Sequence, residues 1–196
     1  MKFILASHNK GKLAEMQKIL GELGVEVVLQ SDLGLDLEPE EDGATFTENA
    51  RIKAQAVMEA SGLPAIADDS GLCVDALNGA PGVYSARYGG LDDDAARCRL
   101  LLQNMRGATN RAAHFHTSIC CAFPNGDMLT ADGDCHGTIA YAPQGENGFG
   151  YDPVFFVPEM RKTFGQLTAE EKNAISHRGK ALEKFQAELK SYLSSR

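Results

Sequence analysis

Four polar residues near the start of the chain, Ser7, Asn9, Lys10 and Lys12, are spaced as in an anion site. They follow the apolar run Phe3 to Ala6 and precede apolar residues at helical spacing. The backbone N–H groups and the dipole at a helix start favour an anion, and the two lysines add positive charge. This pattern predicts a phosphate-binding loop at Ser7-His8-Asn9-Lys10-Gly11-Lys12. The alternative is that Asn9 only caps the helix and the lysines are solvated.

A second candidate is the pair Asp68 and Asp69, which follows the short apolar run 65–67. Ligands of α/β proteins usually bind at the carboxyl ends of buried strands. Carboxylates there can bind Mg²⁺, and one of them can deprotonate a water molecule. An Asp-rich turn explains the pair equally well. The acidic stretch 38–42 could add a metal ligand, although a solvated charge run is the simpler interpretation.

Two later segments carry further polar and aromatic groups. In Gly148-Phe149-Gly150-Tyr151-Asp152, the flanking glycines can expose the Phe149 ring for stacking on a base, although a tight loop with a core aromatic also fits. Lys172 and Ser176-His177-Arg178 could bind a phosphate or a base edge, although alone they would be an ordinary helix surface. We interpret His114 and His116 as structural, and the sequence offers no partner for a site at His136.

The elements that would position these groups alternate between strand and helix. Strands are expected at residues 2–6, 25–29, 65–67, 112–123, 128–139 and 154–157, and helices after residue 12, at 45–61, at 92–105 and at the C-terminus. Thr45 with Glu48 and Thr168 with Glu171 are capping boxes, and Asn125-Gly126 is a hairpin signal. The sequence therefore predicts an α/β fold with a mixed central sheet, flanking helices and two lobes around a substrate cleft.

Composition excludes several classes of protein. The 196 residues include 19 Lys or Arg and 27 Asp or Glu, and the net charge of −8 argues against direct nucleic-acid binding. No apolar run is long enough to span a membrane. The odd set of five cysteines has no C-x-x-C spacing, so neither disulfides nor zinc are indicated. These features favour a cytoplasmic protein with free cysteines.

The order of six motifs is more specific than any one of them. Ser-x-Asn-x-x-Lys is followed by Thr-Phe-Thr-Glu-Asn-Ala, Asp-Asp-Ser-Gly-Leu, Gly-Ala-Pro-Gly-Val-Tyr-Ser-Ala-Arg-Tyr, Gly-Phe-Gly-Tyr-Asp-Pro and Ile-Ser-His-Arg-Gly. Together they resemble the XTP/dITP pyrophosphatase family, the enzymes similar to inosine triphosphate pyrophosphatase. The resemblance covers residues 1–196 as a single domain and implies a homodimer. It implies Mg²⁺-dependent hydrolysis of noncanonical purine nucleoside triphosphates, such as ITP, dITP and XTP, to the monophosphate and pyrophosphate.

The resemblance also assigns roles to residues. It implies that Asp69 is the general base and a Mg²⁺ ligand, and that Glu40, or the adjacent Glu41, is the other metal carboxylate. The implied substrate-binding residues are Ser7, His8, Asn9, Lys10, Gly11, Lys12, Ser70, Phe149, Gly150, Tyr151, Asp152, Lys172, His177 and Arg178. One departure is His8, where many relatives have glycine.

Two other functions remain open from the sequence. One is a pyrophosphatase that prefers modified pyrimidine nucleotides, against which the Ser-His-Arg-Gly and Phe-Gly-Tyr-Asp segments argue. The other is a nucleotide sensor that binds without hydrolysis, against which the pair Asp68 and Asp69 argues because it could supply a base.

Overall fold

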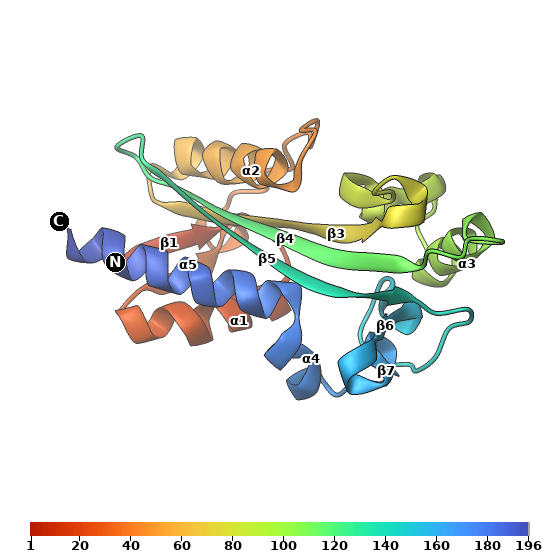
Figure 1. The fold of residues 1–196 in the computed structure, drawn as a ribbon. Helices are drawn as coiled ribbons and strands as arrows, with labels where there is room; N and C mark the ends of the chain where they lie inside the picture. Colours follow the sequence, from red (N-terminus) through yellow and green to blue (C-terminus); the bar gives the residue numbers. More distant parts are fainter. Residues whose placement is uncertain (196) are drawn as a thin grey trace. The chain divides into compact units, whose positions relative to one another are not determined.

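The computed structural model describes residues 1–195 and contains one mixed sheet (Figure 1). Its seven strands lie in the order β2-β1-β3-β4-β5-β6-β7. Their bounds are β1 Lys2–Leu5, β2 Glu26–Leu29, β3 Ala65–Val74, β4 Ala112–Ala122, β5 Met128–Ile139, β6 Phe155–Val157 and β7 Lys162–Thr163. β1 is parallel to both β2 and β3, whereas β6 is antiparallel to β5 and β7. The predicted α/β class with a mixed sheet is confirmed.

The described residues also form five α-helices and seven 3-10 segments. The α-helices are α1 Lys10–Leu20, α2 Phe46–Ser61, α3 Asp94–Asn104, α4 Ala169–Ile175 and α5 His177–Ser194. The 3-10 segments are η1 Gly21–Leu23, η2 Gln30–Leu33, η3 Asp75–Leu77, η4 Gly82–Gly90, η5 Asp152–Val154, η6 Pro158–Met160 and η7 Phe164–Gln166. Both predicted capping boxes are present, since Thr45 and Thr168 each accept the N–H three residues on.

The chain divides into two compact units. Unit 1 contains residues 1–69, 117–133 and the segment from 180 onward, and unit 2 contains residues 70–116 and 134–179. The division falls inside β3, β4 and β5, so no single cut of the chain separates the units. The single domain over residues 1–196 and the cleft between two lobes both stay predictions.

In unit 1, strand β1 lies between two layers of helices. Because strand side chains alternate between faces, Phe3 and Leu5 pack into the core cluster with α1 and α5, while Ile4 packs with Val57 of α2. Figure 1 shows α2 on one face of the sheet and α1 with α5 on the other. The start of α1 is thereby fixed at the end of β1.

Unit 2 has a separate core rich in aromatic rings. Phe115 of β4 packs edge-on against Phe155 of β6 and stacked on Phe164, with ring centroids 4.7 and 5.7 Å apart. Leu72 of β3 and Leu101 of α3 are fully buried in the same cluster. This core supports the segment between β5 and β6, which contains Phe149.

Several predicted boundaries were wrong. β3 does not end before Asp68: it continues to Val74, so both aspartates lie inside a strand rather than in a turn. Neither the 3-10 segment η4 nor the short strand β7 was predicted. Among the described residues, no helix is long and apolar enough to cross a membrane.

The buried face of α5 generates a stability prediction. Phe185 is 0% exposed in the unit 1 core, so Phe185→Ala should lower the free energy of unfolding by about 3–5 kcal/mol through lost burial and an unfilled cavity. Glu188→Ala, on the exposed side of the same helix, should change it by less than about 0.5 kcal/mol. Urea denaturation measures both, and equal losses would contradict the packing of α5.

Candidate active site

The predicted phosphate loop joins β1 to α1, and Asn9 is the N-cap of the helix. Its Oδ1 accepts hydrogen bonds from Gly11 N at 2.8 Å and Lys12 N at 3.1 Å, while Ser7 Oγ accepts one from Asn9 N at 3.1 Å. A Cβ on Gly11 would lie 3.1 Å from Asn9 Oδ1, so glycine relieves crowding at the cap. The cap takes the N–H groups of Gly11 and Lys12, so anion binding here would depend on the helix dipole and on the lysine side chains.

Lys12 turns from this loop toward β3. Its Nζ lies 2.9 Å from Asp68 Oδ1, and the Asp68 side chain is 3% exposed. A carboxylate this deeply buried needs a partner, because an unpaired buried charge is strongly unfavourable. The ion pair therefore fixes Lys12 beside the end of β1, which is where a phosphate group would lie.

Helix α2 supplies two partners for Asp69. Asn49 Nδ2 donates to Asp69 Oδ2 at 3.2 Å, and Lys53 Nζ lies 3.7 Å from Asp69 Oδ1. Lys53 also contacts Glu41 at 3.3 Å, so one ammonium group lies between two carboxylates. Sequence reasoning missed Asn49 and Lys53. Their spacing of four residues places both on one face of α2, and that spacing was the available signal.

The surroundings of Asp69 favour a proton acceptor. Burial raises the pKa of Asp69, and the negative charges of Glu41 and Asp68 add to this rise. Lys53 and the hydrogen bond from Asn49 oppose the rise without cancelling it. A carboxylate with a raised pKa is a stronger base than an exposed one, as general-base catalysis requires.

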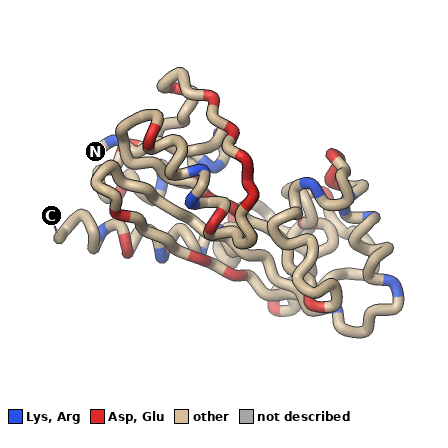
Figure 2. The backbone as a smooth tube through the Cα atoms, turned by 90° about the horizontal axis from the view of Figure 1, so that it is seen from above, with Lys and Arg blue, Asp and Glu red and all other residues tan. Residues whose placement is uncertain are grey.

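A pocket of about 320 Å³ opens in unit 1 beside these groups. Its walls include residues of the phosphate loop, the acidic segment, α2 and β3: Ala6, Ser7, His8, Lys12, Gln30, Leu37, Glu38, Pro39, Glu41, Lys53, Val57 and Asp68. The acidic segment belongs to the run of Asp and Glu that is visible along one stretch of chain in Figure 2. The pocket thus combines two lysines with several carboxylates, which suits a polyanion bound together with a cation.

The predicted metal residue Glu40 does not line this pocket. Glu40 is exposed, whereas Glu41 is half-buried, lines the pocket and contacts Lys53. Of the two alternatives, the geometry therefore favours Glu41. Within the described part of the chain, no three His, Cys, Asp or Glu residues are arranged as a metal cluster. Mg²⁺ is commonly held by only one or two carboxylates, together with water and substrate phosphates, so Asp69 and Glu41 fit this requirement.

His8 connects the phosphate loop to the acidic segment. Its Nε2 lies 3.2 Å from Gln30 Nε2 and 3.3 Å from Asp36 Oδ1. The buried Gln30 amide also donates to Leu37 O at 3.1 Å. A glycine at position 8 could not make these contacts, so the departure noted in the sequence has a structural consequence.

In unit 2, three of the predicted substrate-binding residues, Phe149, Asp152 and Lys172, form one connected group. Asp152 is 3% exposed, and its Oδ2 accepts from Lys172 Nζ at 2.6 Å and from Phe149 N at 3.1 Å. The Phe149 ring is 64% exposed, and Lys172 Nζ lies 4.6 Å from its centroid. A Cβ on Gly148, whose φ is 76°, would lie 2.0 Å from Asp152 Oδ2. Phe149 is thus a loop aromatic held in solvent, as one of the two interpretations predicted.

The remaining predicted residues of unit 2 lie in β3 and α5. His177 is 9% exposed and stacks on Phe115, with ring centroids 4.8 Å apart. Arg178 follows it on α5 and is half-buried, and Ser70 is half-buried in β3. The stacking fixes the His177 ring, so a ligand would meet a preorganised imidazole.

The chain is similar to known proteins over nearly all of its length. A family model described as the Ham1 family matches residues 3–188. A protein named dITP/XTP pyrophosphatase from Exiguobacterium sp. is 50% identical over 96% of this chain and 97% of its own length. One of the same name from Desulforamulus reducens is 51% identical over 94% and 93%.

Two solved structures share the fold. The Ham1 protein of Staphylococcus aureus has a TM-score of 0.93 and 42% identity, covering 98% of this chain and 100% of that chain. A HAM1 protein from Coxiella burnetii has a TM-score of 0.92 and 44% identity, covering 100% of both chains.

The raised pKa of Asp69 generates a prediction about stability. Because folding raises this pKa, the folded chain binds the proton more readily than the unfolded chain, and stability is lost as pH rises through that range. Asp69→Asn removes the ionisable group, and with it this loss of stability at higher pH. We expect its Tm to exceed that of the wild type increasingly as pH rises from the ordinary carboxyl range toward neutrality. An effect of about 1 kcal/mol would shift Tm by roughly 2–4 °C.

Thermal unfolding at a series of pH values measures this difference. Glu40→Gln is the matched control, because Glu40 is an exposed carboxylate of the same unit, and its Tm difference from the wild type should stay near zero. A Tm of Asp69→Asn below that of the wild type at neutral pH would contradict the prediction.

Proposed function

We propose, from the premise that this chain belongs to the Ham1 family, that it hydrolyses noncanonical purine nucleoside triphosphates, namely dITP, XTP and ITP, to the monophosphate and pyrophosphate. The relatives named dITP/XTP pyrophosphatase, about half identical over nearly the whole chain, support this substrate class. The observation in this chain that carries the proposal is the half-buried Asp69 carboxyl, whose pKa is raised by burial although the pocket residue Lys53 lies beside it.

Unit 1 binds the triphosphate. Lys12 and Lys53 line its pocket, and each is already paired with a carboxylate. A bound polyanion shares these ammonium groups with Asp68 and Glu41, so the lysines are held in place before the substrate arrives. Such preorganised charge stabilises the negative charge that develops during phosphoryl transfer.

Asp69 and Glu41 are the residues that hold Mg²⁺ in this proposal. Both contact Lys53, so positive charge is already stabilised between them, and two carboxylates suffice when phosphate and water complete the shell. A bound Mg²⁺ neutralises the phosphate oxygens and the charge of the leaving pyrophosphate.

Asp69 accepts the proton of the attacking water. The water oxygen forms a bond to the α-phosphorus, the bond from that phosphorus to the bridging oxygen breaks, and pyrophosphate leaves with the bonding electrons. Asn49 and Lys53 hold the two oxygens of the Asp69 carboxylate, which fixes its orientation toward the water.

Unit 2 supplies groups for the base. The exposed Phe149 ring stacks on the purine, an interaction worth about 1–3 kcal/mol. Lys172, His177 and Arg178 provide donors for a keto oxygen where adenine carries an amino group. A donor left unpaired against that amino group disfavours adenine nucleotides. The homodimer and the cytoplasmic location stay predictions.

Product analysis tests the bond that is cleaved. With ITP in oxygen-labelled water, we expect IMP and pyrophosphate, with the label in IMP because attack is on the α-phosphorus. Asp69→Asn should lower kcat by about 100- to 10,000-fold, the usual contribution of a general base, while substrate still binds. Products of IDP and phosphate, a preference for modified dUTP analogues, or near-normal turnover of Asp69→Asn would each contradict the proposal.

Paired substitutions test which glutamate binds the metal. Glu41→Gln should raise the Mg²⁺ concentration for half-maximal activity by about tenfold or more, since a ligand carboxylate is lost. Glu40→Gln, which changes the adjacent exposed side chain, should leave that concentration within about twofold. The reverse pattern would return the metal role to Glu40.

A further inference from the structure

The loop that carries Phe149 needs external contacts to hold one conformation. Gly148 and Gly150 flank the ring with φ values of 76° and 61°. Glycine loses more conformational freedom on ordering than any other residue. The Asp152 carboxylate fixes the loop from within, through Phe149 N. The Gly150 peptide lies on the other side of the ring and requires a separate anchor.

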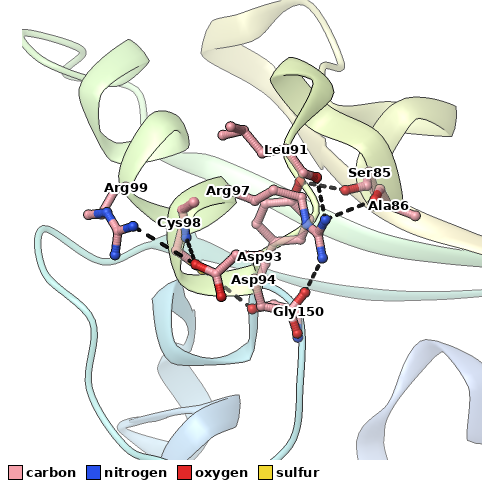
Figure 3. Close-up of polar contacts among 11 residues, drawn as sticks. Ser85, Ala86, Leu91, Asp93, Asp94, Arg97, Cys98, Arg99 and Gly150 are labelled. Carbon is pink, nitrogen blue, oxygen red and sulfur yellow. Dashed lines mark hydrogen bonds and ion pairs between the residues drawn. The ribbon is translucent and has the colours of Figure 1, made fainter.

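The N-terminal part of α3 provides that anchor (Figure 3). Asp94 Oδ2 accepts a hydrogen bond from Gly150 N at 2.7 Å, and Cys98 Sγ donates to Gly150 O at 3.3 Å. Two side chains one helical turn apart therefore hold both polar groups of one residue. Burial raises the pKa of Cys98 to about 11, so the thiol keeps the proton that it donates.

Arg97 fixes the Asp94 carboxylate in turn. Its guanidinium binds Asp94 Oδ1 through Nη2, while Nη1 donates to Ala86 O at 3.0 Å and to Leu91 O at 2.6 Å. Arg97 is thus tied to η4 and the residue that follows it. Burial favours the neutral form of Asp94, but Gly150 N and Arg97 outweigh it and lower the pKa, so the acceptor stays ionised at neutral pH.

A second contact joins the loop to η4. Tyr151 OH donates to Ser85 O at 2.7 Å, and Ser85 Oγ in turn accepts from Leu72 N at 2.9 Å. The residue after Gly150 is therefore anchored to η4 and β3, and its buried side chain adds to the core. With Tyr151 fixed, the Asp94 contact decides the direction of the backbone between Tyr151 and Phe149.

We propose that Asp94 is a positioning residue that fixes the base-binding loop through Gly150, and that Arg97 orients its carboxylate for this task. The proposal rests on the proposed function in that Phe149 binds the base. Asp94 itself need not touch the substrate. It limits the directions in which the Phe149 ring can point before a base binds. Less conformational entropy is therefore lost when the base stacks on the ring.

A fluorescence measurement tests the loop without relying on activity. The chain contains no tryptophan, so Phe149→Trp introduces a single indole at the tip of the loop. In that background, Asp94→Ala should lower the fluorescence anisotropy and increase quenching by acrylamide. Asp94→Asn, which keeps an oxygen for Gly150 N, should restore much of the difference.

Asp93→Ala is the matched control. Asp93 is the N-cap of α3 and accepts from Ala96 N at 2.7 Å, so its loss weakens the same helical turn without removing a contact to the loop. Its anisotropy and quenching should match those of the Phe149→Trp protein. Equal mobility in the Asp94→Ala and Asp93→Ala proteins would overturn the proposal.

Steady-state kinetics of variants that keep Phe149 test whether the position of the loop affects substrate binding. Asp94→Ala should raise KM for ITP roughly tenfold, the effect of losing one hydrogen bond to a charged group, with kcat changed by less than about threefold, since the groups for chemistry lie in unit 1. A mobile loop with an unchanged KM would also overturn the proposal. If the wild type released no pyrophosphate from ITP, the proposed function would fail, while the fluorescence would still report whether Asp94 holds the loop.

Discussion

Charge compensation between two lysines and three carboxylates orders the side chains of the proposed phosphate site in unit 1. Asp68 is buried and paired with Lys12, while Lys53 lies between Asp69 and Glu41. Buried carboxylates are tolerated only with such partners. The same pairing keeps the ammonium groups in fixed positions, so an arriving polyanion meets charge that has already been ordered and partly desolvated.

The compensation is incomplete at Asp69, and this has a functional meaning. Lys53 and Asn49 favour the carboxylate, yet burial and two neighbouring acids outweigh them and raise its pKa. Complete neutralisation would stabilise the fold further but would weaken the base. Active sites commonly retain such unfavourable arrangements because activity depends on them, and the raised pKa of Asp69 is therefore better explained by catalysis than by stability.

Local patterns in the sequence predicted the elements better than their junctions. The apolar run at β1 and the capping box at Thr45 place a strand and a helix correctly, because both signals depend on residues close in the chain. The continuation of β3 through Asp68 and Asp69 was not predicted, since the strand was expected to end at residue 67. Its polar residues form a strand because neighbouring strands satisfy the backbone, and this information is not local.

The need for non-local information also separates the site residues that were predicted from those that were missed. Asp69 and Phe149 stand out by type and by motif, whereas Lys53 and Asp94 have the appearance of ordinary surface residues of helices. Their roles depend on partners 16 and 56 residues away, Asp69 and Gly150. Motifs thus identify groups that contact a ligand, while the groups that orient them are found only once the fold brings distant segments together. Asp94 lies outside every motif for this reason, and the flexible glycines it steadies explain why such a residue is needed.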